Sequence, residues 1–167
     1  REATNPWYNA VYDHVEQAMN DFAAATGRQY QPFEYYGHPQ AERVIILMGS
    51  AIGTCEEVVD ELLTRGEKVG VLKVRLYRPF SAKHLLQALP GSVRNVAVLD
   101  RTKEPGAQAE PLYLDVMTAL AEAFNNGERE TLPRVIGGRY GLSSKEFGPD
   151  CVLAVFADRK STRLNSS

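Results

Sequence analysis

A strand, a glycine turn and a helix follow one another in residues 43–66, which read RVIILMGSAIGTCEEVVDELLTRG. The unbroken apolar run Val44–Met48 is typical of a parallel strand that is covered on both faces. Gly49–Gly53 then forms a turn, and Thr54 with Glu57 three residues later has the spacing of a capping box. The pattern predicts a helix that begins at Thr54. Its buried stripe is expected to contain Val58, Val59, Leu62 and Leu63.

The same order of elements recurs further along the chain. Strands are predicted at Val69–Leu76, Val96–Leu99 and Arg134–Ile136. A short helix is expected after Ser81, and a longer one from Pro111 to a stop at Asn126-Gly127. Successive strand-helix units with short connections predict an α/β fold with an open, mainly parallel sheet and flanking helices.

Helices are also expected at both ends of this unit. Asn5-Pro6 predicts a helix start, and the helix is expected to run to about Ala25. Its apolar residues share one face that must be buried against another surface: Trp7, Val11, Val15, Met19 and Phe22. Residues 28–40 are expected to form an aromatic connector that lies on another surface. Residues 149–156 are expected to form a helix that leaves the sheet.

Composition and charge exclude several classes of protein. The 167 residues, 44% hydrophobic and 24% charged, are typical of a globular protein with its own core. Nineteen basic and twenty-one acidic residues give a net charge of -2 without a dense basic cluster, so no nucleic-acid partner is expected. Apolar runs of about five residues are far shorter than the roughly 20 of a membrane span. Without a signal-peptide pattern, a cytoplasmic location is expected.

Metal-ligating residues are few and scattered. Two cysteines do not match the four thiolates of a cubane iron–sulfur cluster or the close cysteine pairs of a structural zinc site. His14, His38 and His84 lack the spacing that places two imidazoles on one helical face. We therefore expect no metal ion or cofactor to be bound by this segment. Cys55 lies near a helix start, but we interpret it as a small buried apolar side chain.

The candidate binding residues follow the predicted strands. The turn Gly49–Gly53 matches neither the dinucleotide fingerprint nor the nucleotide-triphosphate loop, so it is either an anion site or a plain tight turn. Four cations are expected near the same sheet edge: Arg75, Arg78, Arg101 and Lys103. Guanidinium groups suit phosphates and carboxylates. The alternative is a domain interface with ion pairs to Asp100, Glu104 and Glu110.

No nucleophile is predicted from the serines. Ser50, Ser81 and the pair Ser143-Ser144 lack a Gly-x-Ser-x-Gly elbow and an assigned base, and helix capping explains three of them. Asn125-Asn126-Gly127 has no preceding Gly-Asp-Gly, which thiamine diphosphate enzymes carry, so it is interpreted as a helix stop.

Several long phrases of this sequence resemble one family. They are GEKVGVLKVRLYRPFS at 66–81, VLDRTKEPG at 98–106, EPLYLD at 110–115 and GGRYGLSSKEF at 137–147. Over roughly residues 5–157 the chain resembles the pyruvate:ferredoxin (flavodoxin) oxidoreductases, in particular the long single-chain bacterial form. One departure is Gln108-Ala109, where a glycine-rich join is expected.

The resemblance implies a division of the chain. Residues 1–40 would be the end of a pyrimidine-binding domain with its connector, and residues 41–136 a domain similar to the carboxy-terminal domain of transketolase. Residues 137–158 would link to the next domain. Residues 159–167 do not continue the pattern and are expected to be a non-native tail; without them the net charge changes from -2 to -5, because Arg159, Lys160 and Arg163 are removed.

The resemblance also implies an activity for the full enzyme. Pyruvate, coenzyme A and an oxidised ferredoxin or flavodoxin would give acetyl-coenzyme A, carbon dioxide and reduced carrier, with thiamine diphosphate, magnesium and [4Fe-4S] clusters as cofactors. The remaining domains of the same enzyme and a second copy in a homodimer are the expected partners. No catalytic residue of the family matches a position here, so a supporting role is expected, with the four cations as candidate contacts for a coenzyme A phosphate.

Two alternatives remain open. The chain could be a stand-alone α/β module that binds an anion or nucleotide at the Gly49–Gly53 turn. It could also be a fragment of an oxidoreductase for a different 2-oxoacid.

Overall fold

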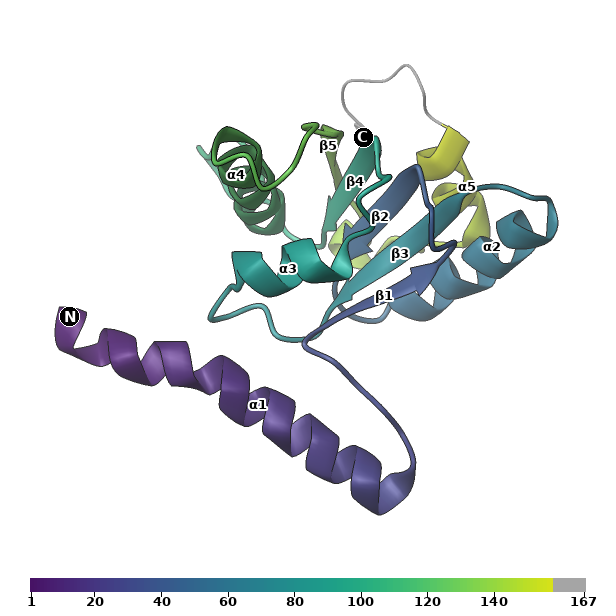
Figure 1. The fold of residues 1–167 in the computed structure, drawn as a ribbon. Coiled ribbons are helices and arrows are strands. Elements are labelled where there is room, and N and C mark those ends of the chain that lie inside the picture. The colour runs from purple at the N-terminus through teal and green to yellow at the C-terminus, as the bar shows by residue number, and fades with distance from the viewer. Residues whose placement is uncertain (158–167) are drawn as a thin grey trace.

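The computed structural model describes residues 1–157 and contains a five-stranded sheet between two layers of helices (Figure 1). The strands are β1 (Phe33–Gly37), β2 (Arg43–Leu47), β3 (Val69–Val74), β4 (Asn95–Asp100) and β5 (Arg134–Arg139). Across the sheet their order is β1-β3-β2-β4-β5, with β1 antiparallel to β3 and the other pairs parallel. The predicted open, mainly parallel α/β sheet is confirmed.

Within the described residues, five α-helices accompany the sheet. They are α1 (Asn5–Thr26), α2 (Ile52–Thr64), α3 (Ala82–Ala88), α4 (Pro111–Asn125) and α5 (Pro149–Ala157), with short 3-10 turns at Glu2–Thr4 and Leu142–Ser144. Helices α3 and α4 cover one face, and α2 and α5 cover the other (Figure 1). The helix predicted at 149–156 is present, and it packs back against α2. None of the helices described is long and apolar enough to cross a membrane.

The sheet has a core on each face because successive strand residues point to opposite sides. In β2, Val44 and Ile46 belong to the core under α3 and α4. Ile45 and Leu47 belong to the core under α2 and α5. All four are at most 1% exposed, as expected for a strand covered on both faces.

The expectation for residues 28–40 was wrong in one respect. Instead of a connector throughout, residues 33–37 form strand β1 at the edge of the sheet. The segment does lie on another surface, because Phe33 pairs with Val74 and Tyr35 with Leu72. The ring of Tyr35 crosses Gly70, and its hydroxyl donates to the carbonyl of His38 at 2.6 Å.

Helix α1 has the bounds that the sequence predicts, but it lies apart from the sheet (Figure 1). Tyr12 is its one buried residue. The Tyr12 ring stacks on His84 of α3, with centroids 3.8 Å apart. The rest of its apolar face is not buried by residues 1–157. The tail predicted at 159–167 lies outside the described residues.

Candidate functional site

The parallel strands end at a common edge, and the turn after β2 lies there. Gly49 has a φ of +89°, a backbone conformation that favours glycine. The amide of Cys55 donates to the carbonyl of Ala51 at 3.1 Å, so helical hydrogen bonding begins at Ala51. The predicted start at Thr54 with its capping box was therefore wrong, because Thr54 already lies inside α2, whose cap position, Ala51, has no side-chain cap.

Arg101 joins the ends of three strands at this edge. Its Nη1 lies 3.4 Å from Ser50 Oγ in the turn after β2, and its Nε lies 3.4 Å from the carbonyl oxygen of Gly141 after β5. The hydroxyl of Tyr140 donates to the carbonyl of Met48 at 2.8 Å. Within residues 1–157, Arg101 has no carboxylate within ion-pair distance. Its charge is therefore directed to solvent and neutral acceptors.

Lys103 lies on the exposed loop between β4 and α4. Glu110 anchors this loop, because it accepts a hydrogen bond from the amide of Glu104 at 2.8 Å and pairs with Arg139. Within the described part of the chain, Lys103 forms no hydrogen bond or ion pair. The fold thus holds the loop while leaving the lysine side chain exposed.

The other two predicted cations have partners inside the chain. Arg75 Nε lies 3.1 Å from Glu34 Oε2, and its guanidinium lies over the Tyr30 ring. Arg78 Nη1 lies 2.8 Å from Asp115 Oδ2, and the guanidinium group of Arg78 stacks over the ring of its neighbour Tyr77. The four cations therefore share an edge of the sheet, but no described contact joins Arg75 or Arg78 to Arg101.

The acids expected to pair with these cations have other roles. Asp100 accepts hydrogen bonds from the amides of Leu112 and Tyr113 at 3.0 and 3.2 Å, which satisfies the first turn of α4. Burial is the largest influence on its carboxyl and raises the pKa of Asp100, against the opposing effect of the two amides. Within residues 1–157, neither Asp100 nor Glu104 forms an ion pair with the four cations.

The serines and Cys55 do not form a nucleophilic site. Ser81 precedes α3 without a side-chain capping bond, and its Oγ lies 2.5 Å from Nδ1 of His84. The imidazole ring stacks on Tyr12, and no carboxylate orients it within residues 1–157. Burial, followed by the charge of Glu56, raises the pKa of the Cys55 thiol to about 12. The thiol is therefore protonated at neutral pH, as its interpretation as a buried apolar side chain requires.

The sequence analysis missed a buried lysine on β3. The side chain of Lys73 is 4% exposed; its Nζ pairs with Glu34 of β1 and lies 2.8 Å from Glu56 Oε1 of α2. It also lies 5.7 Å from the centroid of the Tyr36 ring. A lysine inside the apolar run VGVLKV was the available signal, because a buried charge needs an opposite charge beside it. This cluster connects β1, β3 and α2.

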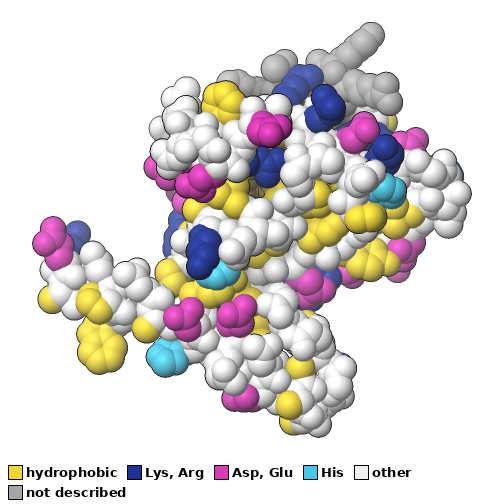
Figure 2. Space-filling model, viewed as in Figure 1, with side chains coloured by type: hydrophobic (Ala, Val, Ile, Leu, Met, Phe, Trp, Pro, Cys, Tyr) yellow, Lys and Arg dark blue, Asp and Glu magenta, His cyan; other side chains and the backbone are white. Residues whose placement is uncertain are grey.

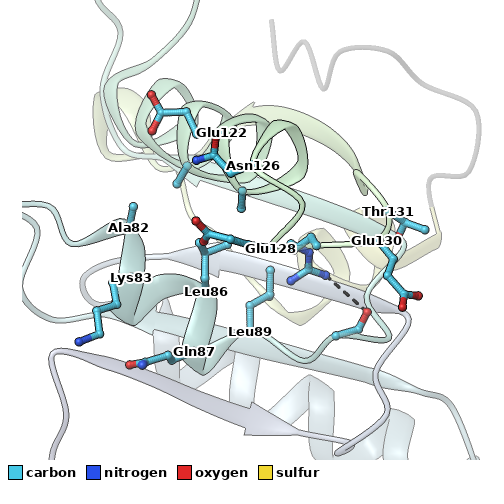
Figure 3. Close-up of a pocket in the computed structure, with 14 residues that line it drawn as sticks. Ala82, Lys83, Leu86, Gln87, Leu89, Glu122, Asn126, Glu128, Glu130 and Thr131 are labelled. Carbon is cyan, nitrogen blue, oxygen red and sulfur yellow. Dashed lines mark hydrogen bonds between the residues drawn. The ribbon is translucent and has the colours of Figure 1, made fainter.

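Two cavities lie away from the carboxyl ends of the strands. The larger one, about 860 Å³, lies between α3, α4 and the segment that leads into β5 (Figure 3). Aliphatic side chains such as Leu86 and Leu89 form part of its wall, and Glu122, Asn126 and Glu128 lie around it. A second cavity of about 380 Å³ lies at the amino ends of β2, β4 and β5. Within residues 1–157, the Thr131 hydroxyl in the lining of the larger cavity forms no hydrogen bond to a base.

The described side chains do not form a metal site. Residues 1–157 contain no group of three or more His, Cys, Asp and Glu side chains arranged to hold a metal ion. Cys55 is buried and Cys151 is half-buried, and neither is in a disulfide. The described donor set does not fit an iron–sulfur cluster or a protein-bound magnesium ion.

Comparison with known proteins gives one consistent family. The family model described as "Pyruvate:ferredoxin oxidoreductase core domain II" matches residues 41–142. The chain is 98% identical over 158 residues to a probable pyruvate-flavodoxin oxidoreductase of Escherichia coli, covering 95% of this chain and 14% of that protein. It is 55% identical over 162 residues to the pyruvate:ferredoxin oxidoreductase of Moorella thermoacetica, covering 97% of this chain and 13% of that protein.

A solved structure is more distantly similar. It is a 2-oxoglutarate:ferredoxin oxidoreductase from Magnetococcus marinus, with a TM-score of 0.48 and 20% sequence identity over 76% of this chain and 19% of that chain. The two relatives named above are much longer than the present chain, which spans about one seventh of their length.

Proposed function

Because the chain belongs to the pyruvate:ferredoxin oxidoreductase core domain II family, we propose that it is a supporting segment of an enzyme that oxidatively decarboxylates pyruvate. In that reaction the bond between the carboxylate and carbonyl carbons breaks and carbon dioxide leaves. The acetyl group forms a thioester with coenzyme A, and two electrons pass to flavodoxin or ferredoxin. The 98% identity to the Escherichia coli relative is the observation that carries this proposal.

The supporting role follows from the side chains of this segment. Its buried charged residues all have structural contacts: Lys73 joins β1, β3 and α2, Asp100 accepts from the first turn of α4, and Glu110 holds the loop before α4. Since the donor set fits no cluster, we propose that thiamine diphosphate, magnesium and [4Fe-4S] clusters are bound by other parts of the full-length enzyme. The cytoplasmic location and the homodimer belong to the same proposal.

A contact with coenzyme A stays a prediction for the four cations. Arg101 and Lys103 are better candidates than Arg75 and Arg78, because the latter pair with Glu34 and Asp115. In the full-length enzyme, Arg101→Ala with Lys103→Ala should raise the Kd of coenzyme A roughly 5- to 150-fold, since each of the two lost contacts contributes roughly 0.5–1.5 kcal/mol. Arg65→Ala, at the end of α2, is the control. An unchanged Kd would remove this contact from the proposal.

The activity itself is tested on the full-length enzyme that contains this segment. Reduction of flavodoxin under anaerobic conditions should require both pyruvate and coenzyme A and release acetyl-coenzyme A. A preference for 2-oxoglutarate or a longer 2-oxoacid would favour the alternative of a different oxidoreductase. Equilibrium dialysis of the 167-residue chain against nucleotides addresses the stand-alone module, and specific binding lost in Arg101→Ala would favour that alternative.

A further inference from the structure

Helix α1 has an apolar arc that is wider than its contact with the sheet domain. At 100° per residue, the apolar side chains from Trp7 to Ala23, apart from Ala10, fall within an arc of about 160°. Along this arc their order is Trp7, Ala18, Val11, Phe22, Val15, Tyr8, Met19, Tyr12 and Ala23. An arc of this width is typical of a helix that is covered along most of one side.

The arc is covered only in part: Val11, Val15 and Met19 are half-buried, while the aromatic side chains at its amino-terminal end are exposed. Tyr12, near one margin, is 6% exposed and stacks on His84. Trp7, at the opposite margin, is 77% exposed, and Tyr8 is 60% exposed. Apolar side chains are visible on the amino-terminal part of α1 that projects from the molecule (Figure 2). Within residues 1–157, neither Trp7 nor Tyr8 makes a ring contact or hydrogen bond.

The uncovered patch, Trp7 and Tyr8 with the half-buried Val11 beside them, is small for a stable dimer. Two aromatic side chains bury roughly 150–250 Å² each, whereas a standard interface buries about 800 Å² per partner. A contact within one polypeptide needs less area, because it does not lose the translational freedom of a second molecule. The patch therefore fits an intramolecular partner better than a second copy.

We propose that this patch of α1 packs against a segment of the same polypeptide that lies outside residues 1–167. The inference rests on the proposed function, because it requires this chain to be part of the longer enzyme. The chain spans 14% of its Escherichia coli relative, so most of such a polypeptide would lie elsewhere. The position of α1 beside the sheet domain leaves its outward side open to that segment (Figure 1).

A photo-crosslink in the full-length enzyme tests the proposal. Trp7→p-benzoylphenylalanine should crosslink, on irradiation, to a peptide outside residues 1–167 in a product of single-chain mass. Gln17→p-benzoylphenylalanine is the matched control, because Gln17 is exposed and lies outside the arc; it should give at most about one fifth of that product. A product of doubled mass, or crosslinks confined to this segment or absent, would overturn the inference.

Hydroxyl-radical footprinting provides a second measurement on the unsubstituted enzyme. Trp7 should be oxidised at least about fivefold more slowly in the folded full-length enzyme than after unfolding in urea. Equal rates would contradict the inference. Pyruvate-dependent flavodoxin reduction is measured on the same preparation, so a reactive enzyme with an unprotected Trp7 rejects the packing proposal while leaving the proposed function intact. A protected Trp7 without that activity rejects the function instead.

Discussion

Helices α2 and α1 both have an apolar face, but they differ in what covers it. In 13 residues α2 buries four side chains, Cys55, Val58, Val59 and Leu62. In 22 residues α1 buries only Tyr12. The spacing of apolar residues therefore predicts which side of a helix needs a partner, while the partner itself depends on the rest of the polypeptide.

The largest expected effect is on the well-covered helix. Leu62→Ala should lower the free energy of unfolding of the chain by about 2–4 kcal/mol, because it leaves a cavity under α2. Urea unfolding measures this loss. Glu61→Ala, one residue away on the exposed side, should change it by less than about 1 kcal/mol. Equal effects of the two substitutions would contradict the difference between the faces of α2.

A smaller loss is expected when the charged connection to α2 is removed. Lys73→Met should lower the free energy of unfolding by about 1–3 kcal/mol, because Glu34 and Glu56 lose their shared cation. Because both glutamates are partly exposed, this loss in the free energy of unfolding should be smaller than the cost of a fully buried unpaired charge. Urea unfolding at neutral pH is the measurement, and Lys68→Met, which removes an exposed pair with Glu42, is the control.

The same cluster should make stability depend on pH. Burial tends to raise the pKa of Glu34, but the hydrogen bonds and charges of Lys73 and then Arg75 outweigh burial and hold that pKa below its ordinary 4.5. The contribution of Glu34 is therefore complete above that value and is lost as the pH falls through the lowered pKa. Between about pH 6 and pH 3, Glu34→Gln should lose less stability than the unsubstituted chain. If the two proteins lost stability equally over this pH range, the lowered pKa of Glu34 would not be the cause of the pH dependence.

Removing the one buried contact of α1 should affect that helix more than the sheet domain. Tyr12→Ala should change the free energy of global unfolding by no more than about 1 kcal/mol, since α1 can separate locally. Limited proteolysis should cut within residues 5–26 faster in this variant than in the unsubstituted chain. Loss of the whole fold would show that α1 is an integral part of the core.

The smallest effect on stability is expected at the outward side of α1. Trp7→Ser should change the free energy of unfolding by less than about 0.5 kcal/mol, because the residue is exposed. It should, however, reduce the binding of a hydrophobic dye to the chain, because it removes apolar surface. Unchanged dye fluorescence would show that this surface does not bind the dye.

The regular parts of the fold were predictable because their signals are local. The run at 44–48 indicated β2, and Pro111 with Asn126-Gly127 marked the ends of α4 within one residue. The family resemblance, carried by long phrases, is confirmed by the match over residues 41–142. Strand β1 was missed because its place is set by pairing with β3, more than thirty residues later in the chain.

The candidate site was less predictable for a related reason. A cation after a strand has the same local sequence whether it pairs with an acid or remains exposed. Arg75 and Arg101 both follow strands, yet only Arg75 has a glutamate beside it, supplied by β1. Their distinction therefore required the position of an edge strand that the sequence pattern did not reveal.

The crossing of the Tyr35 ring over Gly70 couples two positions that lie far apart in the gene. A methyl group at residue 70 would overlap the ring, so a larger side chain there would require the aromatic group to move. In a library randomised at residues 35 and 70 and selected for folding, a larger side chain at residue 70 should be tolerated only together with a smaller one at residue 35. The two codons are therefore expected to vary as a pair.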